Sequence, residues 1–459
     1  MDVVCFVLIS VMLCCGFQAK GDARFYRYFK DTRNGLETLR APEGLISDRR
    51  GPTPFAGTAT SPTNIAFDLL TQLESMRFKE LEPMAKLSIQ HTIDILQKIP
   101  TARENGLFYS RYLPSYPYTV VDDSLSSIDN LHLAQALWTI SKSFKDYRVR
   151  LAAKTLFDKM NFTAYYDLNS GLFHGILRRS EKGWIPDSWY FAYFGSESRS
   201  LYSLAFVLHL IKDERFLKRA FSSFMQDFII GKSETGRPEI LMAVWDGGAF
   251  QMLLPELLLG ESRYSSWLPQ LFSNFSRLLL REEKKRGLPL PAGHSACQIN
   301  EDLYENGQLI CPTKGCYNGQ TGNLIISALS NADTNNLYLR DQWEAVVTPH
   351  ALFLAASVDS SLYSSSFDQM EKLGLYAPGL GFWDGYGVSG KSRGKVVHEL
   401  LSLDQGMIAL SLGKIMAPDH LTVSARTLME DPTSRRRLRR FYSKMDNFFN
   451  KQIRLKTLN

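Results

Sequence analysis

Five acidic residues of this chain stand alone among aromatic, glycine or serine residues, and they are spread over nearly its whole length. The five are Asp129, Glu197, Asp246, Asp384 and Asp404. Apolar and aromatic surroundings destabilise the charged form of a carboxyl group and raise its pKa, so one carboxyl can stay protonated while another is ionised. With aromatic side chains that can stack on pyranose rings, this pattern predicts carboxylate chemistry on a sugar.

Breaking a glycosidic bond needs an acid to protonate the leaving oxygen and a carboxylate to activate water or attack the sugar. We expect Glu197 to be the general acid, because tyrosine and phenylalanine residues flank it in YFGSESRSLY. The alternative is that it caps the following helix or pairs with Arg199. Asp404 is expected to be the base, and Asp129 its rival or the residue that holds a hydroxyl group or the water.

Aromatic residues beside Asp and Gly are expected to bind the sugar. The candidate substrate-binding residues are Trp245, Asp246, Phe250, Trp383, Asp384, Tyr386 and Arg199, with Trp189 as a further aromatic platform. In a helical protein an aromatic residue is more often part of the core, and this alternative stays open for each. His350 and His398 could contact substrate or be structural residues.

The elements that must position these residues are helices. From Ser61 the apolar residues recur at helical spacing, as at Ile65, Leu69 and Leu73, while alternation typical of strands is confined to pieces such as GLFHGIL. Helices alternate with loops rich in Gly, Trp, Tyr and Asp in units of about 35 to 45 residues, without identical repeats. We predict an all-α fold, an (α/α)6 barrel made of a double ring of helix hairpins with short β-like loop segments.

Several short motifs occur in an order that resembles a known family. They are Thr60-Ser61-Pro62-Thr63-Asn64-Ile65, Ser127-Ile128-Asp129-Asn130, Glu197-Ser198-Arg199, Trp245-Asp246-Gly247-Gly248-Ala249-Phe250, Val347-Thr348-Pro349-His350-Ala351, Gly381-Phe382-Trp383-Asp384 and Asp404-Gln405-Gly406-Met407. Over residues 61–416 the chain resembles the glycoside hydrolases that process β-1,2-glucan, together with glucoamylase-like domains and exported bacterial relatives.

The resemblance implies an (α/α)6 fold, a glucan-like substrate and no obligatory cofactor. We expect no metal site. One departure concerns the segment at Leu403-Asp404, where the cyclic-glucan synthase branch has two histidines. This chain is therefore more similar to the glucoamylase-like branch. The expected function is an exported glycoside hydrolase or transglycosylase acting on an oligo- or polysaccharide of β-glucan type. The alternative is an inactive carbohydrate-binding or envelope-associated barrel.

Charge is concentrated at the C-terminus. Residues 431–459 contain nine Lys or Arg and two Asp, a net charge of +7, whereas the whole chain of 459 residues carries +6. The remainder is nearly neutral, so charge does not indicate nucleic-acid binding. The segment 431–459 is predicted to be a basic amphipathic helix. It either lies on an anionic membrane surface or caps the barrel with its basic face in solvent.

The N-terminal residues predict export. Residues 3–17 are apolar, the length of a signal-peptide core and short for a membrane span. We expect residues 1–20 to be a signal peptide or an N-terminal anchor, residues 21–57 an extended approach segment, and residues 58–430 the barrel. The protein is expected to be periplasmic or secreted. Three cysteines outside the leader, Cys297, Cys311 and Cys316, allow one disulfide without fixing the pair.

Overall fold

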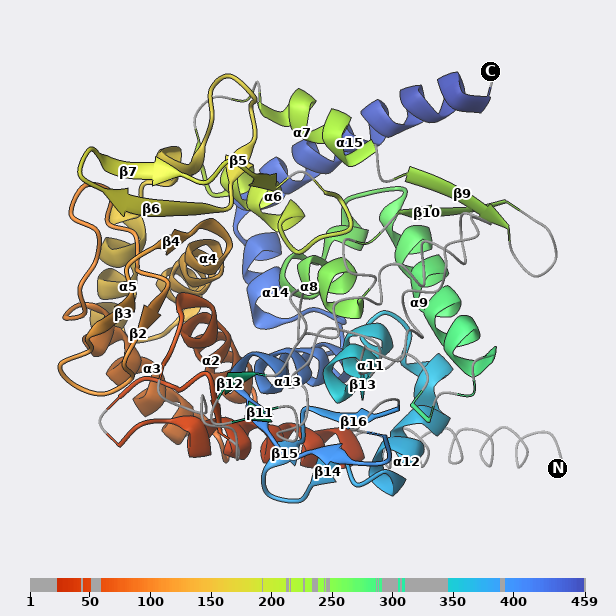
Figure 1. The fold of residues 1–459 in the computed structure, drawn as a ribbon, viewed down its shortest axis with the longest axis horizontal. Coiled ribbons are helices and arrows are strands. Elements are labelled where there is room, and N and C mark those ends of the chain that lie inside the picture. Colours follow the sequence, from red (N-terminus) through yellow and green to blue (C-terminus); the bar gives the residue numbers. More distant parts are fainter. Residues whose placement is uncertain are drawn as a thin grey trace, which may run out of the picture.

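The protein is a helical barrel with small β-sheets in its loops (Figure 1). The computed structural model describes residues 23–42, 44–50, 59–191, 193–211, 214, 216–225, 228–232, 238–242, 244, 248–285, 287, 289–290, 304–305, 308–309, 346–388 and 393–457. The predicted leader and all six cysteines lie outside these residues. Within them, no helix combines the length and the apolar character that crossing a membrane requires.

Six helices of the described chain form the inner ring. They are α2 (Pro62–Ser75), α4 (Ser127–Ser143), α6 (Arg199–Val207), α8 (Ala249–Leu259), α11 (Pro349–Ala356) and α13 (Ser402–Met416). Each contacts the next one, and α13 contacts α2, which closes the ring. In this order α6 and α13 lie on opposite sides. The predicted (α/α)6 barrel is confirmed.

The outer helices alternate with the inner ones along the chain. They are residues 23–39, α3 (Glu82–Leu96), α5 (Tyr147–Lys159), α7 (Phe216–Phe224), α9 (Leu268–Lys285) and α12 (Ser364–Lys372). Burial separates the two rings. All residues of α2 are buried, whereas α5 buries Val149, Ala153 and Leu156 and turns its other faces to solvent. Because every outer helix returns the chain, the inner helices run in the same direction, and their N-termini meet at one end.

The opposite end of the barrel is closed by α14 (Val423–Glu430), which contacts α2, α4 and α8. Gln135 of α4 donates hydrogen bonds to Ser424 Oγ at 2.7 Å and to the carbonyl of Leu258 at 2.8 Å. Thr422 donates to the carbonyl of Leu257 at 2.9 Å. The carbonyl groups at the end of α8 are thereby satisfied inside the protein, and one end of the barrel remains for a site.

The N-terminal segment departs from the prediction of an extended approach segment over residues 21–57. Residues 23–39 form an outer helix whose Tyr28, Phe29, Leu36 and Leu39 are buried. Their spacing places them on one face of a helix, and burying that face stabilises it more than the polar residues between them disfavour it. Strand β1 (Arg49–Arg50) then pairs with β18 (Leu400–Leu401). The barrel therefore begins before residue 58.

The described strands form antiparallel sheets of two or three strands in the loops, as the short β-like segments predicted. Their pairs are β2 (Arg111–Tyr112) with β3 (Val120–Asp122), β5 (Phe173–His174) with β8 (Tyr190–Phe191), β9 (Phe228–Lys232) with β10 (Pro238–Met242), β11 (Tyr304–Glu305) with β12 (Gln308–Leu309), and β14 (Tyr376–Ala377) with β15 (Gly381–Phe382). Two sheets have three strands: β4 (Leu125–Ser126), β6 (Ile176–Ser180) and β7 (Gly183–Pro186), and β13 (Val346–Val347), β16 (Gly385–Gly387) and β17 (Val396–Val397). Strands β4 and β18 lead directly into α4 and α13.

The basic C-terminal segment is the helix α15 (Pro432–Thr457), dark blue in Figure 1. It contacts α6, α7 and α14, and its apolar residues Leu438, Phe441, Met445 and Phe449 are buried in the main core. Of the two alternatives for this segment, the structure supports a helix that covers the barrel with its basic face in solvent. Its apolar face is packed in the core, so only its basic side chains could contact a membrane surface.

Candidate active site

The predicted carboxyl groups gather at the end of the barrel where the inner helices begin. Asp129 and Asp404 lie in the first turns of α4 and α13, and Glu197 comes two residues before α6. Asp384 lies between β15 and β16, next to the start of α13. Residues far apart in sequence thus share one end of the ring, with Glu197 and Asp404 on opposite walls.

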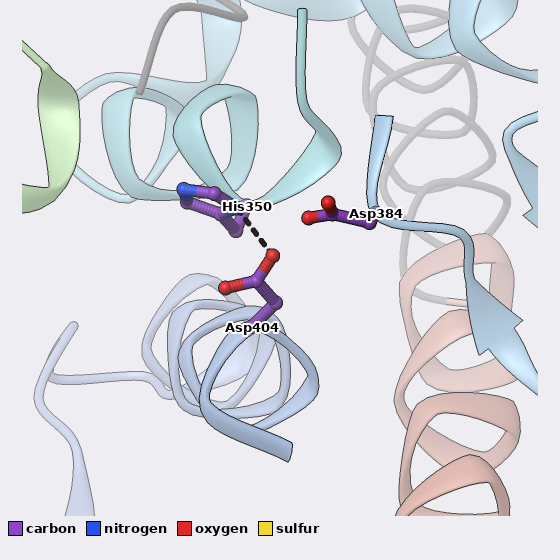
Figure 2. A group of neighbouring side chains, drawn as sticks. All are labelled: His350, Asp384 and Asp404. Atoms are coloured by element: carbon purple, nitrogen blue, oxygen red, sulfur yellow. Dashed lines mark ion pairs between the residues drawn. The ribbon is translucent and has the colours of Figure 1, made fainter. Parts of the chain in front are cut away.

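His350, Asp384 and Asp404 form a buried cluster (Figure 2). His350, at the start of α11, places Nδ1 2.9 Å from Asp404 Oδ2. The Asp384 side chain is hydrogen-bonded to Asp404. Burial raises the pKa of Asp404 to about 7; the hydrogen bond from Asp384 opposes this rise, Asp48 adds to it, and Arg49 opposes it. Two buried carboxyl groups bonded in this way share a proton.

The same three residues offer ligand atoms that all lie within 4.8 Å of one another. One imidazole and two carboxylates could hold a divalent cation. The same two residues already contact each other directly as an ion pair, with 2.9 Å between His350 Nδ1 and Asp404 Oδ2. We therefore read the cluster as a proton-sharing group in which Asp404 can act as a base.

Asp129 combines a structural role with a position at a cavity. Ser126 caps α4 by accepting a hydrogen bond from the backbone N–H of Asp129 at 3.3 Å. The carboxyl group accepts a hydrogen bond from Thr63, and burial raises its pKa while the Thr63 and Ser126 hydroxyls and Arg111 oppose the rise. Asp129 also lines a cavity of about 300 Å³. The cavity is walled by the starts of α2, α4 and α13.

Glu197 lies just before α6, at the same end of the barrel, with its carboxyl group toward α4. Its side chain is 17% exposed, and Oε2 lies 4.0 Å from Nε2 of His132. Its backbone N–H donates to Gln251 Oε1 at 3.0 Å, which ties the segment to α8. The N-cap position of α6 belongs to Ser198, so the capping alternative does not describe Glu197. The carboxyl group is positioned and reached by solvent, as a proton donor must be.

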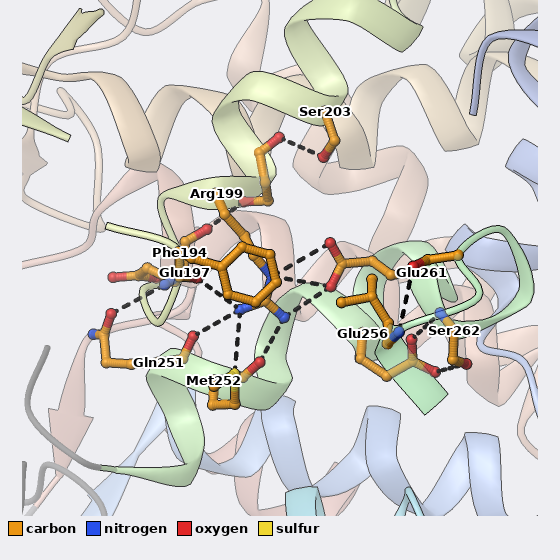
Figure 3. A network of polar contacts seen from close by, with 12 residues as sticks. Phe194, Glu197, Arg199, Ser203, Gln251, Met252, Glu256, Glu261 and Ser262 are labelled. Carbon is orange, nitrogen blue, oxygen red and sulfur yellow. Dashed lines mark hydrogen bonds and ion pairs between the residues drawn. The ribbon is translucent and has the colours of Figure 1, made fainter. Parts of the chain in front are cut away.

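Arg199 has a different place from the predicted contact with substrate (Figure 3). It is 2% exposed, and its guanidinium pairs with Glu261 at 2.8 Å. It also donates to the carbonyls of Phe194, Gln251 and Met252. In Figure 3 the Glu197 carboxyl group points away from this network. Because these groups engage the guanidinium inside the protein, we assign Arg199 to holding the segment before α6 and leave it out of the site.

The predicted aromatic platforms are divided. Trp383 and Tyr386 are partly buried beside Asp384, and the Trp383 ring lies 5.1 Å from that of His398. Phe250 is partly buried in the first turn of α8. Trp189 is 43% exposed on the loop after β7. Trp245 and Asp246 lie outside the described residues and stay predictions.

Three neighbours of the carboxyl groups were not among the predicted site residues. Asp48 is bonded to Asn64 at 2.9 Å and raises the pKa of Asp129 and of Asp404. Thr63 and His132 connect Asp129 with Glu197. Asp48 stands in a polar segment with no aromatic neighbour that could have marked it. Thr63 lies within the motif at residues 60–65. His132 comes shortly after the motif at residues 127–130, one helical turn from Asp129.

No family model matches the sequence, and no curated protein matches it. Solved structures do resemble it. An endo-β-1,2-glucanase of Talaromyces funiculosus has a TM-score of 0.70 at 10% identity, over 93% of this chain and 90% of that one. The endo-β-1,2-glucanase of Chitinophaga pinensis has a TM-score of 0.66 at 13% identity, over 92% and 97%. The chain has the fold of these glucanases.

The glucoamylase-like side of the resemblance is represented as well. A Bacteroides uniformis protein proposed to be a glucoamylase has a TM-score of 0.66 at 13% identity, over 91% of this chain and 96% of that one. The resemblance drawn from the ordered motifs is therefore confirmed at the level of the glucanase fold. A shared fold does not establish activity, which depends on the residues of the site.

Proposed function

We propose that the protein hydrolyses a β-1,2-glucan, with Glu197 as the general acid and Asp404 as the general base. The observation that carries the proposal is the position of these two groups at the same end of the ring, with Glu197 just before α6 and Asp404 in the first turn of the opposite helix α13. In the reaction, the Glu197 carboxyl gives its proton to the leaving glycosidic oxygen. The Asp404 carboxylate takes a proton from the water that attacks the anomeric carbon.

The neighbours support the substrate class. One glucanase of the same fold is seen, as a glutamate-to-glutamine mutant, with β-1,2-glucan, and also with sophorose. Another is seen with sophorotriose and glucose. In this chain Asp129 and the cavity of about 300 Å³ would hold a sugar hydroxyl group or the water. Trp383, Tyr386 and Phe250 would supply apolar surface for the sugar ring.

Export belongs to the proposal as well. The apolar residues 3–17 have the length of a signal-peptide core, which supports export. N-terminal sequencing of the protein recovered from the medium or the periplasm would test this. A mature N-terminus near residue 20 is expected, and recovery of the intact leader would speak for an anchor.

The test of function compares wild type with Glu197→Gln on linear β-1,2-glucan and a panel of other glucans. We expect product from β-1,2-glucan and a fall in kcat of about 10²- to 10⁴-fold in the variant, the range for loss of a general acid. Glu181→Gln, the same change at an exposed glutamate, is the matched control and should match wild type. Equal turnover by Glu197→Gln would remove Glu197 from the acid role. Binding without turnover of any glucan would favour an inactive carbohydrate-binding barrel.

A further inference from the structure

A line of polar side chains leads from Asp129 to Glu197 through the wall of the barrel. The carboxyl of Asp129 is hydrogen-bonded to the hydroxyl of Thr63 on α2. That hydroxyl lies 3.1 Å from Nδ1 of His132 on α4. The other ring nitrogen, Nε2, lies 4.0 Å from Oε2 of Glu197. The hydrolytic roles given above do not use Thr63 or His132.

The middle of this line is closed to solvent. His132 is 1% exposed and Thr63 is 6% exposed, and the ring of Phe67 packs edge-on against the imidazole at 5.5 Å. Burial lowers the pKa of His132 to about 3, so the ring is neutral. Among the described residues, Nε2 is a buried atom without a hydrogen-bond partner, and Glu197 is the carboxyl group that it faces.

A neutral imidazole has one N–H donor and one acceptor nitrogen, and the Thr63 hydroxyl has a single proton. When Asp129 is ionised, Thr63 donates to it and His132 Nδ1–H donates to Thr63. Nε2 then presents a lone pair to Glu197, which suits a protonated carboxyl. When Asp129 is protonated, every donor reverses and Nε2–H points at an ionised Glu197.

The two arrangements contain the same number of protons. In passing from the first to the second, the Glu197 proton moves to His132 Nε2. The Nδ1 proton moves to Thr63 Oγ1, and the proton already on Thr63 moves to Asp129 Oδ1. If both carboxyl groups were ionised, two lone pairs would face each other somewhere along the line, which is costly in a buried site.

We propose that Asp129, Thr63, His132 and Glu197 form a proton-sharing chain that holds one proton between the two carboxyl groups and delivers it to Glu197 when substrate binds. Once Glu197 has given this proton to the leaving oxygen, solvent reaching the partly exposed Glu197 supplies the next one. Thr63 and His132 are positioning residues in this chain, and Asp129 stores the proton. The inference rests on the proposed role of Glu197 as the acid. The 4.0 Å gap at Glu197 is expected to shorten when substrate fills the site, as catalytic hydrogen bonds do.

Other groups around the chain bear on its charge. Asp48 favours the protonated form of Asp129 and Arg111 favours the ionised form. Burial raises the pKa of Tyr165, and the nearby carboxylate of Asp129 adds to this rise. At the far end, Gln251 holds the backbone of Glu197 and faces its amide N–H with a neutral oxygen. These groups are the same in the variants below, so they cancel in the comparison.

The test uses Thr63→Val, which keeps the shape and removes the hydroxyl, with Thr63→Ser as the matched control that restores it. The alkaline limb of kcat/KM on β-1,2-glucan reports loss of the Glu197 proton. In Thr63→Val this limb should move about one pH unit lower, with the plateau kcat within a few-fold of wild type. Thr63→Ser should behave as wild type. A limb that Thr63→Val leaves unchanged, or that Thr63→Ser moves equally, overturns the proposal.

A second measurement needs no activity. In protein labelled with ¹⁵N-histidine, the shifts of the two ring nitrogens of His132, assigned by their loss in His132→Gln, report its tautomer. In wild type both tautomers should be populated, so that both ring nitrogens have averaged shifts, while the ring stays neutral between about pH 5 and about pH 9. In Thr63→Val, where the line to Asp129 is cut, a single tautomer should dominate. Formation of an imidazolium in this range, or the same tautomer populations in both proteins, would overturn the proposal even if the glucan is never cleaved.

Discussion

Asp404 is held where its two protonation states are close in free energy. Desolvation disfavours the carboxylate, while hydrogen bonding from Asp384 favours it, and His350 Nδ1 lies 2.9 Å from Oδ2. A base works best when its pKa is near the working pH, and burial among such partners provides that match. At the scale of single residues, the cluster tunes the proposed base, whereas Glu197, on the opposite wall and 17% exposed, is the proposed donor to the leaving group.

The pH dependence of turnover tests this assignment. The base must be ionised, so kcat/KM should rise as the pH increases through about 7, the value to which burial raises the pKa of Asp404. Asp404→Asn should lower kcat about 10²- to 10⁴-fold. Dialysis against a chelator should leave the limb in place. If the chelator abolishes it, the three residues hold a cation and the base assignment is wrong.

The raised pKa of Asp404 also makes the stability of the fold depend on pH. The pKa of Asp404 in the folded protein is raised above its usual 3.8 to about 7, so its contribution to stability is full below about pH 4 and is lost as the pH rises through about 7. The uncharged Asn avoids this loss. The melting temperature of Asp404→Asn relative to wild type should therefore be higher at about pH 8 than at about pH 4.

Sequence reading found most of the carboxyl groups but not what connects them. Asp384 and Asp404 were recognisable because tryptophan and glycine flank Asp384 and because glutamine and glycine follow Asp404. Asp48, in contrast, acts only because the chain folds back to place it between α2 and α13. A buried hydroxyl such as that of Thr63 also has no local signal. Contacts of this kind depend on three-dimensional neighbours, which spacing along one chain does not encode.

At the scale of elements, the segment before α6 depends on a buried ion pair. Arg199 and Glu261 are each 2% exposed at their side chains, and Tyr442 of α15 donates to Glu261 at 2.7 Å. Replacing the arginine leaves a buried carboxylate and backbone carbonyls without their donor. This network links α6, α8 and α15, and it fixes the backbone two residues from Glu197.

We therefore expect Arg199→Met to lower the free energy of unfolding by about 3–5 kcal/mol, the cost of breaking a buried pair by removing one partner. Arg178→Met is the matched control, because Arg178 pairs with Asp187 while 60% of its side chain is exposed. Its cost should be below about 1 kcal/mol. Denaturant unfolding of the two variants measures the difference. Equal effects would show that the Arg199 network adds little stability.

Helices were predictable where periodicity was long and undisturbed, as in α2 and α4. The outer helix at residues 23–39 was not, because glycine- and proline-containing stretches surround it and its polar positions outnumber the apolar ones. Its Tyr28 and Phe29 pack against α11 and the segment after α2 only in the closed barrel. The sequence carried the helical spacing, yet the surface that makes it stable lies hundreds of residues away.

On the scale of the whole molecule, closure of the barrel requires both chain ends. Residues 23–39 complete the outer ring, and Arg40 pairs with Asp68 of α2 at 2.8 Å. Helix α15 covers α6, and α14 closes the end of the barrel opposite the candidate site. The barrel is thus one cooperative unit and not a core with dispensable tails.

Truncation tests this unity. A chain of residues 23–459 should unfold in a single cooperative transition, whereas residues 59–459 should lose it, because the buried faces of Tyr28, Phe29 and their neighbours have no substitute. Thermal unfolding followed by near-UV circular dichroism distinguishes the two. A cooperative transition in residues 59–459 would show that the N-terminal helix is an accessory.

The common direction of the inner helices has an electrical consequence. Each helix carries a partial positive charge of about half a unit at its N-terminus and the opposite at its C-terminus. The described inner helices therefore sum their dipoles along the barrel axis. The candidate site's carboxyl groups lie at the positive end. At the other end Arg77 donates to the carbonyl of Gly413 at 2.8 Å and Lys414 lies in the last turn of α13, each also paired with a buried glutamate, Glu74 and Glu256. The summed helix dipoles can thus stabilise several carboxylates at the N-terminal end of the inner helices, where an uncharged sugar would enter.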